Sequence, residues 1–97
     1  MIVARVIGTV VCTQKDSRLN GHILQVVEPV VMATQKSDGK PLVAIDTVGA
    51  GRGEIVLVVT GSSARQTDAT TGTPVDAVIM GIVDSIDLDG QKVFEKG

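Results

Sequence analysis

The sequence has very few aromatic residues. Phe94 is the only one among 97 residues, and Trp and Tyr are absent. Proteins that bind single-stranded nucleic acid stack bases on aromatic side chains and follow the backbone with a basic groove. This chain instead carries a net charge of -2, from 9 Lys and Arg against 11 Asp and Glu. The composition therefore predicts no nucleic-acid partner and no anionic membrane surface.

Cysteine and histidine are equally scarce. Cys12 is the only Cys, which excludes an intramolecular disulfide, and His22 is the only His. One thiol and one imidazole cannot supply the three or four ligands of a zinc site. We interpret Cys12 as a small core residue and His22 as an exposed or interfacial imidazole. The sequence thus predicts no catalytic residue, no metal and no cofactor.

Long apolar runs are missing as well. No segment approaches the ~20 apolar residues of a membrane span. The first residues also lack the basic region and the long apolar stretch of a signal peptide. We therefore expect no membrane association.

The apolar residues that are present are mostly branched at Cβ. There are 17 Val and 8 Ile against 5 Leu, together with 9 Thr. Such side chains favour pleated strands and mildly disfavour helices. A mean hydropathy of +0.31 is too high for a disordered tail. The composition predicts a single, mainly β domain over residues 1–97.

Alternating apolar positions and turn signals divide the chain into five or six strands. In the first segment Ala4, Val6 and Gly8 lie on one small apolar face, where Gly8 permits a bend or bulge. Turns are expected at 20–21 and 89–90. The predicted strands cover residues 2–13, 22–31, 41–46, 55–60, 78–86 and 92–95.

One short helix is expected between the later strands. Residues 61–66 are typical of a helix start, with Ser62 or Ser63 as the N-cap. Residues 74–77 predict one more helical turn, with Pro74 at its first position. Long strands with a bend-permitting glycine and a short intervening helix favour a small closed or half-closed barrel.

A glycine-rich segment precedes the strand at 55–60. We call its residues the glycine loop: Gly49, Ala50, Gly51, Arg52 and Gly53. It imitates a phosphate-binding loop but lacks the Lys-Ser/Thr pair, and a strand follows where a helix is required. We therefore do not expect nucleotide binding. Alternate glycines permit close approach of backbone, as in a tight turn, a narrow pore or a symmetric contact.

The apolar surface exceeds what a domain of this size can bury in its own core. Residues 55–60 are apolar on both faces, which predicts one face in the core and the other against something else. Surplus apolar surface usually marks an interface. The residues themselves therefore predict an oligomer without a detectable active site.

Several segments, in this order, resemble the EutN/CcmL family of bacterial microcompartment vertex proteins. The resemblance runs from residue 2 to about residue 86. Its segments are residues 4–11 and 13–15 with Leu19 and Gly21, then 48–54, 61–65, 74–77 and 81–84. Residues 32–41 and the tail after Asp87 depart from the family pattern.

The resemblance implies a small barrel of oligonucleotide-binding (OB)-like topology and a structural rather than an enzymatic role. It implies a homopentamer that closes the vertices of a polyhedral shell in the bacterial cytoplasm. Its partners would be hexameric and trimeric shell proteins. Carried over to this chain, it puts the glycine loop near the fivefold axis. It puts Ser62, Ser63 and Arg65 at the subunit interface.

Two other interpretations remain for comparison. An OB-like module that binds single-stranded nucleic acid or a small ligand would need a basic groove and aromatic residues. A small enzyme using Ser62 or Ser63 with His22 would show a hydrolytic activity that is lost when His22 is replaced. Neither accounts for the ordered run of matching segments.

Overall fold

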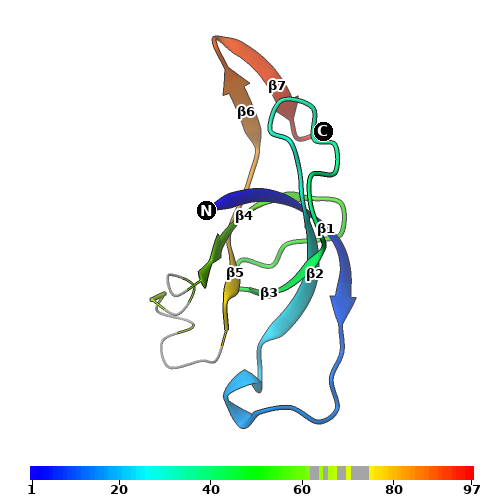
Figure 1. Cartoon of the computed structure of the whole chain (residues 1–97), viewed down its shortest axis with the longest axis vertical. Coiled ribbons are helices and arrows are strands. Elements are labelled where there is room, and N and C mark those ends of the chain that lie inside the picture. Colours follow the sequence, from blue (N-terminus) through cyan, green and yellow to red (C-terminus); the bar gives the residue numbers. More distant parts are fainter. Residues whose placement is uncertain (62–63, 65, 68–69, 71–74) are drawn as a thin grey trace.

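Strands dominate the computed structural model, which describes residues 1–61, 64, 66–67, 70 and 75–97 (Figure 1). The mainly β prediction is confirmed. The described elements are β1 (Ile2–Val10), the 3-10 turn η1 (Ser17–Leu19), β2 (Ile23–Pro29), β3 (Leu42–Asp46), β4 (Ile55–Thr60), β5 (Ala77–Ile82), β6 (Ser85–Leu88) and β7 (Gln91–Glu95).

Five of these strands form a closed barrel in the order β1-β2-β3-β5-β4, with β4 pairing back onto β1. All neighbours are antiparallel except β3 and β5, which are parallel. This is the predicted OB-like arrangement, and closure leaves the barrel no free strand edge. The remaining strands, β6 and β7, form a separate two-stranded sheet.

The parallel seam between β3 and β5 is the shortest contact in the barrel. Its register contains two residue pairs, Ile45 with Val78 and Asp46 with Ile79. The Thr47 hydroxyl reinforces it by donating to the Ile79 carbonyl at 2.7 Å. Barrel closure therefore depends on the residues at the end of β3.

The bend predicted in the first strand is present. The pairing of β1 with β2 shifts register between Val6 and Gly8, as a β-bulge does. A Cβ added at Gly8 would lie 3.8 Å from Val26, an ordinary contact. The bulge rather than crowding explains the bend.

Several predicted elements differ from the structure. The strand expected over 22–31 spans Ile23–Pro29. The strand expected over 78–86 is interrupted, because β5 ends at Ile82 and β6 starts at Ser85. The strand expected over 2–13 ends at Val10. The helical turn expected at 74–77 is also wrong in its described part, because Ala77 already opens β5 and Val75 is irregular.

The helix expected at 61–66 includes Ser62, Ser63 and Arg65, which lie outside the described residues. The described residues Gly61 and Ala64 of this range have 3-10 conformation. The helical element with described bounds is η1, in the loop between β1 and β2. Asp16 caps η1 by accepting from the Arg18 backbone N–H at 2.9 Å. Hydrogen bonds from Arg18 lower the pKa of Asp16 to about 2.

Two apolar cores lie on the two faces of the barrel wall. The first fills the barrel with mostly small or β-branched side chains: Ala4, Val6, Val27, Ala44, Ala50, Val56, Val58, Ala77 and Ile79. The second lies on the outer face, where Ile45, Ala64 and Val78 are buried together against Leu19, Leu24, Val59 and Val75. Ala64, four residues after β4, thus covers part of the second apolar face within the chain itself.

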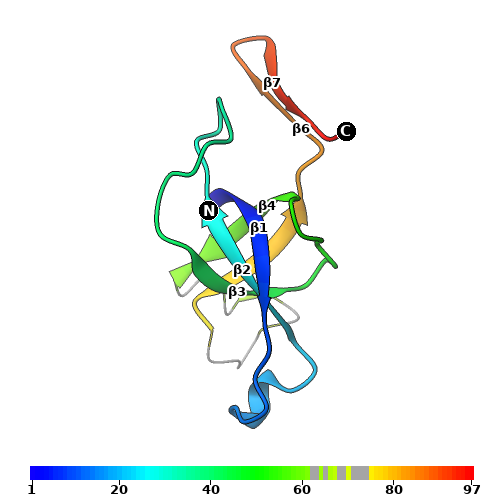
Figure 2. The same cartoon turned by 90° about the vertical axis from the view of Figure 1, so that its right-hand side faces the viewer.

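The molecule is elongated, with extents of 45 × 24 × 22 Å. Figures 1 and 2 show the β6–β7 hairpin and the loop between β2 and β3 at one end of the long axis, and η1 at the other. The barrel lies between them, and the glycine loop crosses its wall between β3 and β4.

Candidate functional site

The first half of the glycine loop is organised by one carboxylate at the end of β3. The Oδ1 atom of Asp46 accepts hydrogen bonds from the N–H groups of Val48 and Gly49, both at 3.0 Å. Its Oδ2 atom accepts from the Ala50 N–H at 2.8 Å. Gly49 has φ +75, a conformation that glycine adopts without strain. The chain therefore wraps tightly around the Asp46 side chain.

Gln25 of β2 braces the same turn from inside the barrel wall. It is buried, and its Nε2 donates to the Ala50 carbonyl at 3.0 Å and to Asp46 Oδ2 at 3.3 Å. Its Oε1 accepts from the Thr9 hydroxyl at 2.8 Å. One amide thus connects β1, β2, β3 and the glycine loop. A buried amide satisfied on both its ends fixes geometry as well as adding stability.

The second half of the loop is held by Glu54 and by the backbone of β1. Glu54 Oε1 accepts from the Gly51 N–H at 2.6 Å. The Gly53 N–H donates to the Val6 carbonyl at 2.8 Å, and the Val6 N–H donates to the Glu54 carbonyl at 3.0 Å. Gly53 has φ +90, and a Cβ added at Gly51 would lie 3.2 Å from the Glu54 carboxylate.

These bonds occupy the N–H groups that a phosphate would need. The donors already engaged belong to Val48, Gly49, Ala50, Gly51 and Gly53. An anion-binding nest requires such groups to be free and convergent. The loop's own carboxylates fill that role, which gives a physical reason for the prediction against nucleotide binding.

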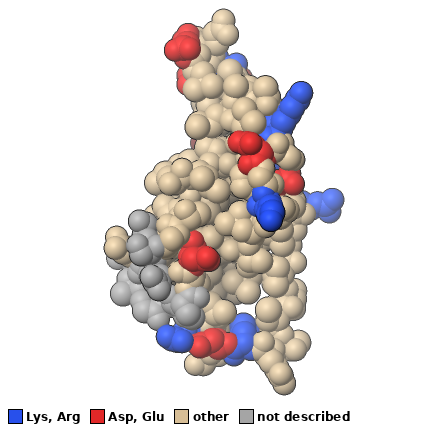
Figure 3. All heavy atoms as spheres, viewed as in Figure 1, with Lys and Arg blue, Asp and Glu red and all other residues tan. Residues whose placement is uncertain are grey.

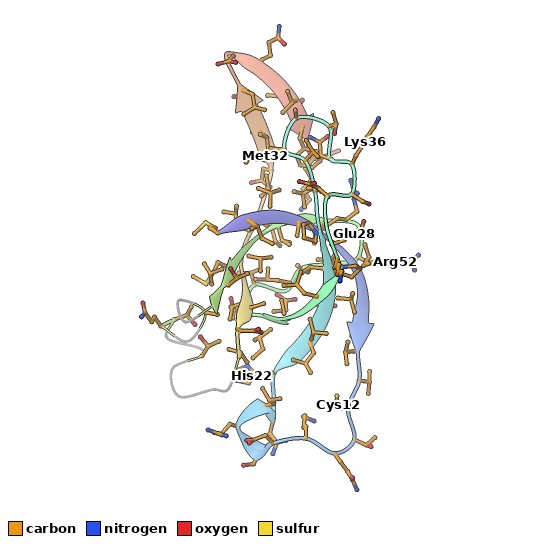
Figure 4. The ribbon with its side chains drawn as sticks, in the orientation of Figure 1. Cys12, His22, Glu28, Met32, Lys36 and Arg52 are labelled. Carbon is orange, nitrogen blue, oxygen red and sulfur yellow. The ribbon has the colours of Figure 1, made fainter. Side chains whose placement is uncertain are left out.

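The glycine loop is presented outward. Ala50 is buried under Gln25, whereas Gly49, Gly51, Arg52 and Gly53 are exposed. Figure 4 shows the Arg52 side chain on the outside of the barrel wall. Within the described part of the chain, Arg52 forms no ion pair. The site is therefore a braced surface loop that carries one positive charge.

An ion pair links this loop to the far end of the chain. Lys96 Nζ contacts Glu54 Oε2, and the Lys96 N–H donates to the Asp84 carbonyl at 2.8 Å. The Lys96 ammonium, and after it the Gly51 N–H, lower the pKa of Glu54. The same bond to Glu54 raises the pKa of Lys96. Glu54 therefore fixes the glycine loop with one oxygen and the root of the β6–β7 hairpin with the other.

The remaining residues singled out in the sequence lie elsewhere. Cys12 is beyond the end of β1 and half-buried, so its assignment to the core is wrong. Together with His22 and Lys15 it lines an open cavity of about 240 Å³ between the ends of β1 and β2. No group of three or more His, Cys, Asp or Glu among the described residues could hold a metal ion. In the same part of the chain, no helix is long and apolar enough to cross a membrane.

The predicted interface residues Ser62, Ser63 and Arg65 lie outside the described residues. Conversely, sequence reasoning missed the two residues that hold the glycine loop, Asp46 and Gln25. A signal for each existed: an Asp three residues before a glycine-rich segment, and a lone polar residue on the inward face of a predicted strand.

The fold and the loop define a closed OB-like barrel whose conspicuous feature is a rigid surface turn. The family model described as "Ethanolamine utilisation protein EutN/carboxysome" matches residues 1–84. The chain therefore belongs to the EutN/CcmL family.

Named relatives agree with this assignment. The bacterial microcompartment shell vertex protein EutN of Salmonella typhimurium is 45% identical over 96 residues, covering 99% of this chain and 96% of that protein. The structure of CcmL from Nostoc sp. PCC 7120 matches with a TM-score of 0.93 and 40% identity, covering 99% and 100% of the two chains. The GrpN pentameric microcompartment shell protein from Rhodospirillum rubrum matches with a TM-score of 0.82 and 45% identity, covering 91% and 99%.

The same comparison corrects one expectation about the tail. Residues after Asp87 were expected to be particular to this protein, and the family model does end at residue 84. The CcmL structure nevertheless covers 99% of this chain at a TM-score of 0.93. The β6–β7 hairpin is therefore shared with that relative.

We predict that Asp46→Ala destabilises the protein by about 2–4 kcal/mol, because it removes a charged acceptor of four hydrogen bonds and leaves the N–H of the buried Ala50 without its acceptor. Urea unfolding followed by circular dichroism measures this, since the chain has no Trp or Tyr for fluorescence. Asp38→Ala, the same substitution at an exposed carboxylate, should change the free energy of unfolding by less than about 0.5 kcal/mol. Equal effects at the two positions would contradict the role of Asp46.

We predict that the stabilisation from Glu54 depends on pH. Because its folded pKa is depressed, this contribution is present above the unfolded value of ~4.3 and is lost as pH falls through the lower folded value. Glu54→Gln should lower the thermal unfolding midpoint at pH 7, and its difference from the parent should shrink towards zero in acid. Asp38→Asn, at an exposed carboxylate that forms no ion pair with the described residues, is the control. A pH-independent difference would argue against the ion pair.

Proposed function

We propose that this protein is a structural subunit of a bacterial microcompartment shell, forming a homopentamer that closes a vertex of the polyhedral shell. The observation that carries this proposal is the match over nearly the whole chain to shell vertex proteins, one of them a pentameric shell protein. In this role the protein is not an enzyme, and it lies within the shell in the bacterial cytoplasm.

The surface supports assembly into a ring. Several large apolar side chains remain exposed on an otherwise well-packed barrel, which is typical of an interface. They come from β1, β2, β3, β5 and their loops: Ile7, Val11, Ile23, Val31, Met32, Val43, Val48 and Met80. A closed ring uses two different surfaces of each subunit, so apolar residues on several sides are expected.

Closure of the barrel also limits how neighbours can bind. Because the five barrel strands are all paired, a neighbouring chain cannot extend this sheet by adding a strand. Contacts between subunits therefore use side chains and projecting loops. Facet contacts with hexameric and trimeric shell proteins follow from the vertex position and belong to the same proposal.

We place the glycine loop near the fivefold axis. Its exposed glycines permit close approach of neighbouring backbones, and Asp46 and Glu54 keep it rigid. Five copies of Arg52 would then surround one opening. Ser62, Ser63 and Arg65 remain our proposed interface residues from the family pattern.

The OB-like binding module is the alternative to a shell subunit. The net charge of -2 and the single aromatic residue give it neither a basic groove nor a stacking platform.

We predict that the purified chain forms a species of about 50 kDa, five times its 10.0 kDa mass, in native mass spectrometry at low micromolar concentration. Mixing the chain with hexameric shell proteins should then give closed particles that contain it, whereas the hexamers alone should leave open vertices. A stable monomer in both experiments would refute the vertex role.

We predict that Arg52→Cys, in a Cys12→Ser background, cross-links between neighbouring chains with a short thiol-reactive linker. Identical residues of a fivefold ring come close together only near the axis, so a single cysteine suffices there. Arg18→Cys is the matched control, since this exposed arginine lies on η1 at one end of the molecule. A ring that stays intact in native mass spectrometry but gives no Arg52 cross-link would refute the placement of the loop.

A further inference from the structure

The β6–β7 hairpin projects from the barrel as a separate arm (Figures 1 and 2). The chain leaves the barrel after β5, where the Val83 N–H makes a last bond to the Ile55 carbonyl at 2.8 Å. The hairpin reverses at Asp89 and Gly90, with φ +51 and +80. A two-stranded hairpin alone in water is marginally stable. Its root is fixed through Lys96, but its body needs a surface to pack against.

The apolar side chains of the hairpin are incompletely covered. Ile86 and Phe94 face each other across the strands, and Val93 lies at an irregularity in their pairing. All three are only half-buried, and Leu88 near the tip is 38% exposed. The chain's only aromatic residue thus lies on an arm outside the barrel. This is an arrangement typical of a contact surface.

A second projection lies at the same end of the molecule. We call residues 31–40, between β2 and β3, the Met32 loop (Figure 4). Internal hydrogen bonds keep it rigid: the Gln35 N–H donates to the Val31 carbonyl at 2.7 Å, and Gln35 Nε2 donates to the Met32 carbonyl at 2.7 Å. Val31 and Met32 are nevertheless 39% and 52% exposed. A preorganised loop that presents apolar side chains loses little entropy on binding.

The two projections carry opposite charges. The hairpin tip holds Asp87 and Asp89, whereas the Met32 loop holds Lys36, Asp38 and Lys40 and has a net charge of +1. Figure 3 shows acidic atoms at the tip and a separate basic projection towards the opposite side of the same end. Among the described residues, none of these five side chains forms an ion pair within the chain. Complementary charges that are unpaired in one chain fit a contact between two chains.

The chain exposes more surface than a compact monomer of its mass, so it has surface available for burial against a neighbouring chain. Its accessible surface is 5852 Å². This is about 600 Å² more than the ~5200 Å² expected of a compact 10.0 kDa monomer. The surplus approaches the ~800 Å² that each partner buries in a standard interface.

We propose that the hairpin of one chain packs against the Met32 loop of the next chain in the ring. Leu88 then covers Val31 and Met32, and the acidic tip faces Lys36 and Lys40. Both projections lie at one end of the long axis, so rotation about an axis along it brings one onto the other. This contact rests on the proposed function, because it requires a ring.

Disulfide trapping tests this contact. In a Cys12→Ser background, one chain carries Leu88→Cys and another carries Met32→Cys. After the two chains are refolded together and oxidised, we expect a disulfide-linked heterodimer. The double variant in one chain should give a ladder of covalent species up to the pentamer. Met32→Cys with Val11→Cys, an 85% exposed position at the other end of β1, is the matched control pair and should give no ladder.

Native mass spectrometry before oxidation separates the two proposals. An intact ring without a ladder, or with only a disulfide inside one chain, would overturn the contact and leave the pentamer standing. Trapping that appears only after facet proteins are added would also overturn it. A parent chain that forms no ring would overturn both.

Hydrogen exchange of the parent chain provides a test that needs no substitution. Amides of β6, β7 and the Met32 loop should exchange about tenfold more slowly in the ring than in the diluted monomer. Equal exchange in both states would overturn the contact, even if the cysteine variants failed to fold.

Discussion

The carboxylate of Asp46 is the interaction on which the rest of the structure depends. The backbone of Asp46 contributes one of the two residue pairs in the parallel seam that closes the barrel. The Asp46 side chain accepts four hydrogen bonds. Closure and the shape of the glycine loop are thereby fixed at one residue. Gln25 connects the glycine loop to β1 and β2 by hydrogen bonds. A displacement of the loop therefore strains its contacts with these two strands.

Closure of the barrel limits which surfaces can form contacts between chains. The barrel strands have no free edge, the outer core covers part of the second apolar face, and the remaining apolar groups are distributed over loops and one projecting arm. Glu54 connects two of these features, because its two oxygens hold the glycine loop and the root of the hairpin. A vertex subunit needs surfaces that keep their relative positions, and this ion pair provides one such link.

Much of the fold was predictable, because local patterns are strong where strands are half-buried. The alternation of apolar residues predicted the inward face of β1, and the turn signal at Asp89 and Gly90 predicted the β6–β7 hairpin. The polar residues Asp84 and Ser85 lie at the interruption after Ile82, but two polar residues in an otherwise apolar segment are equally compatible with one continuous strand that is partly exposed. Cys12 lies outside the core because the pairing of β1 with β2 ends at Val10. The alternation of apolar residues continues past this point, so it does not show where the strand ends.

The sequence by itself determined the β class, the turn positions, the family and the lack of an aromatic or basic binding surface. These properties follow from residue type and from contacts between near neighbours in the chain. The tertiary structure decided that Asp46, Gln25 and Glu54 hold the glycine loop, and that the hairpin and the Met32 loop lie at one end. The bonds from Asp46 and Glu54 to the loop backbone are local, whereas those from Gln25 to Asp46 and Ala50 and from Lys96 to Glu54 join residues 21 to 42 positions apart. The long-range contacts exist only in the folded barrel, so residue patterns along the chain do not reveal them.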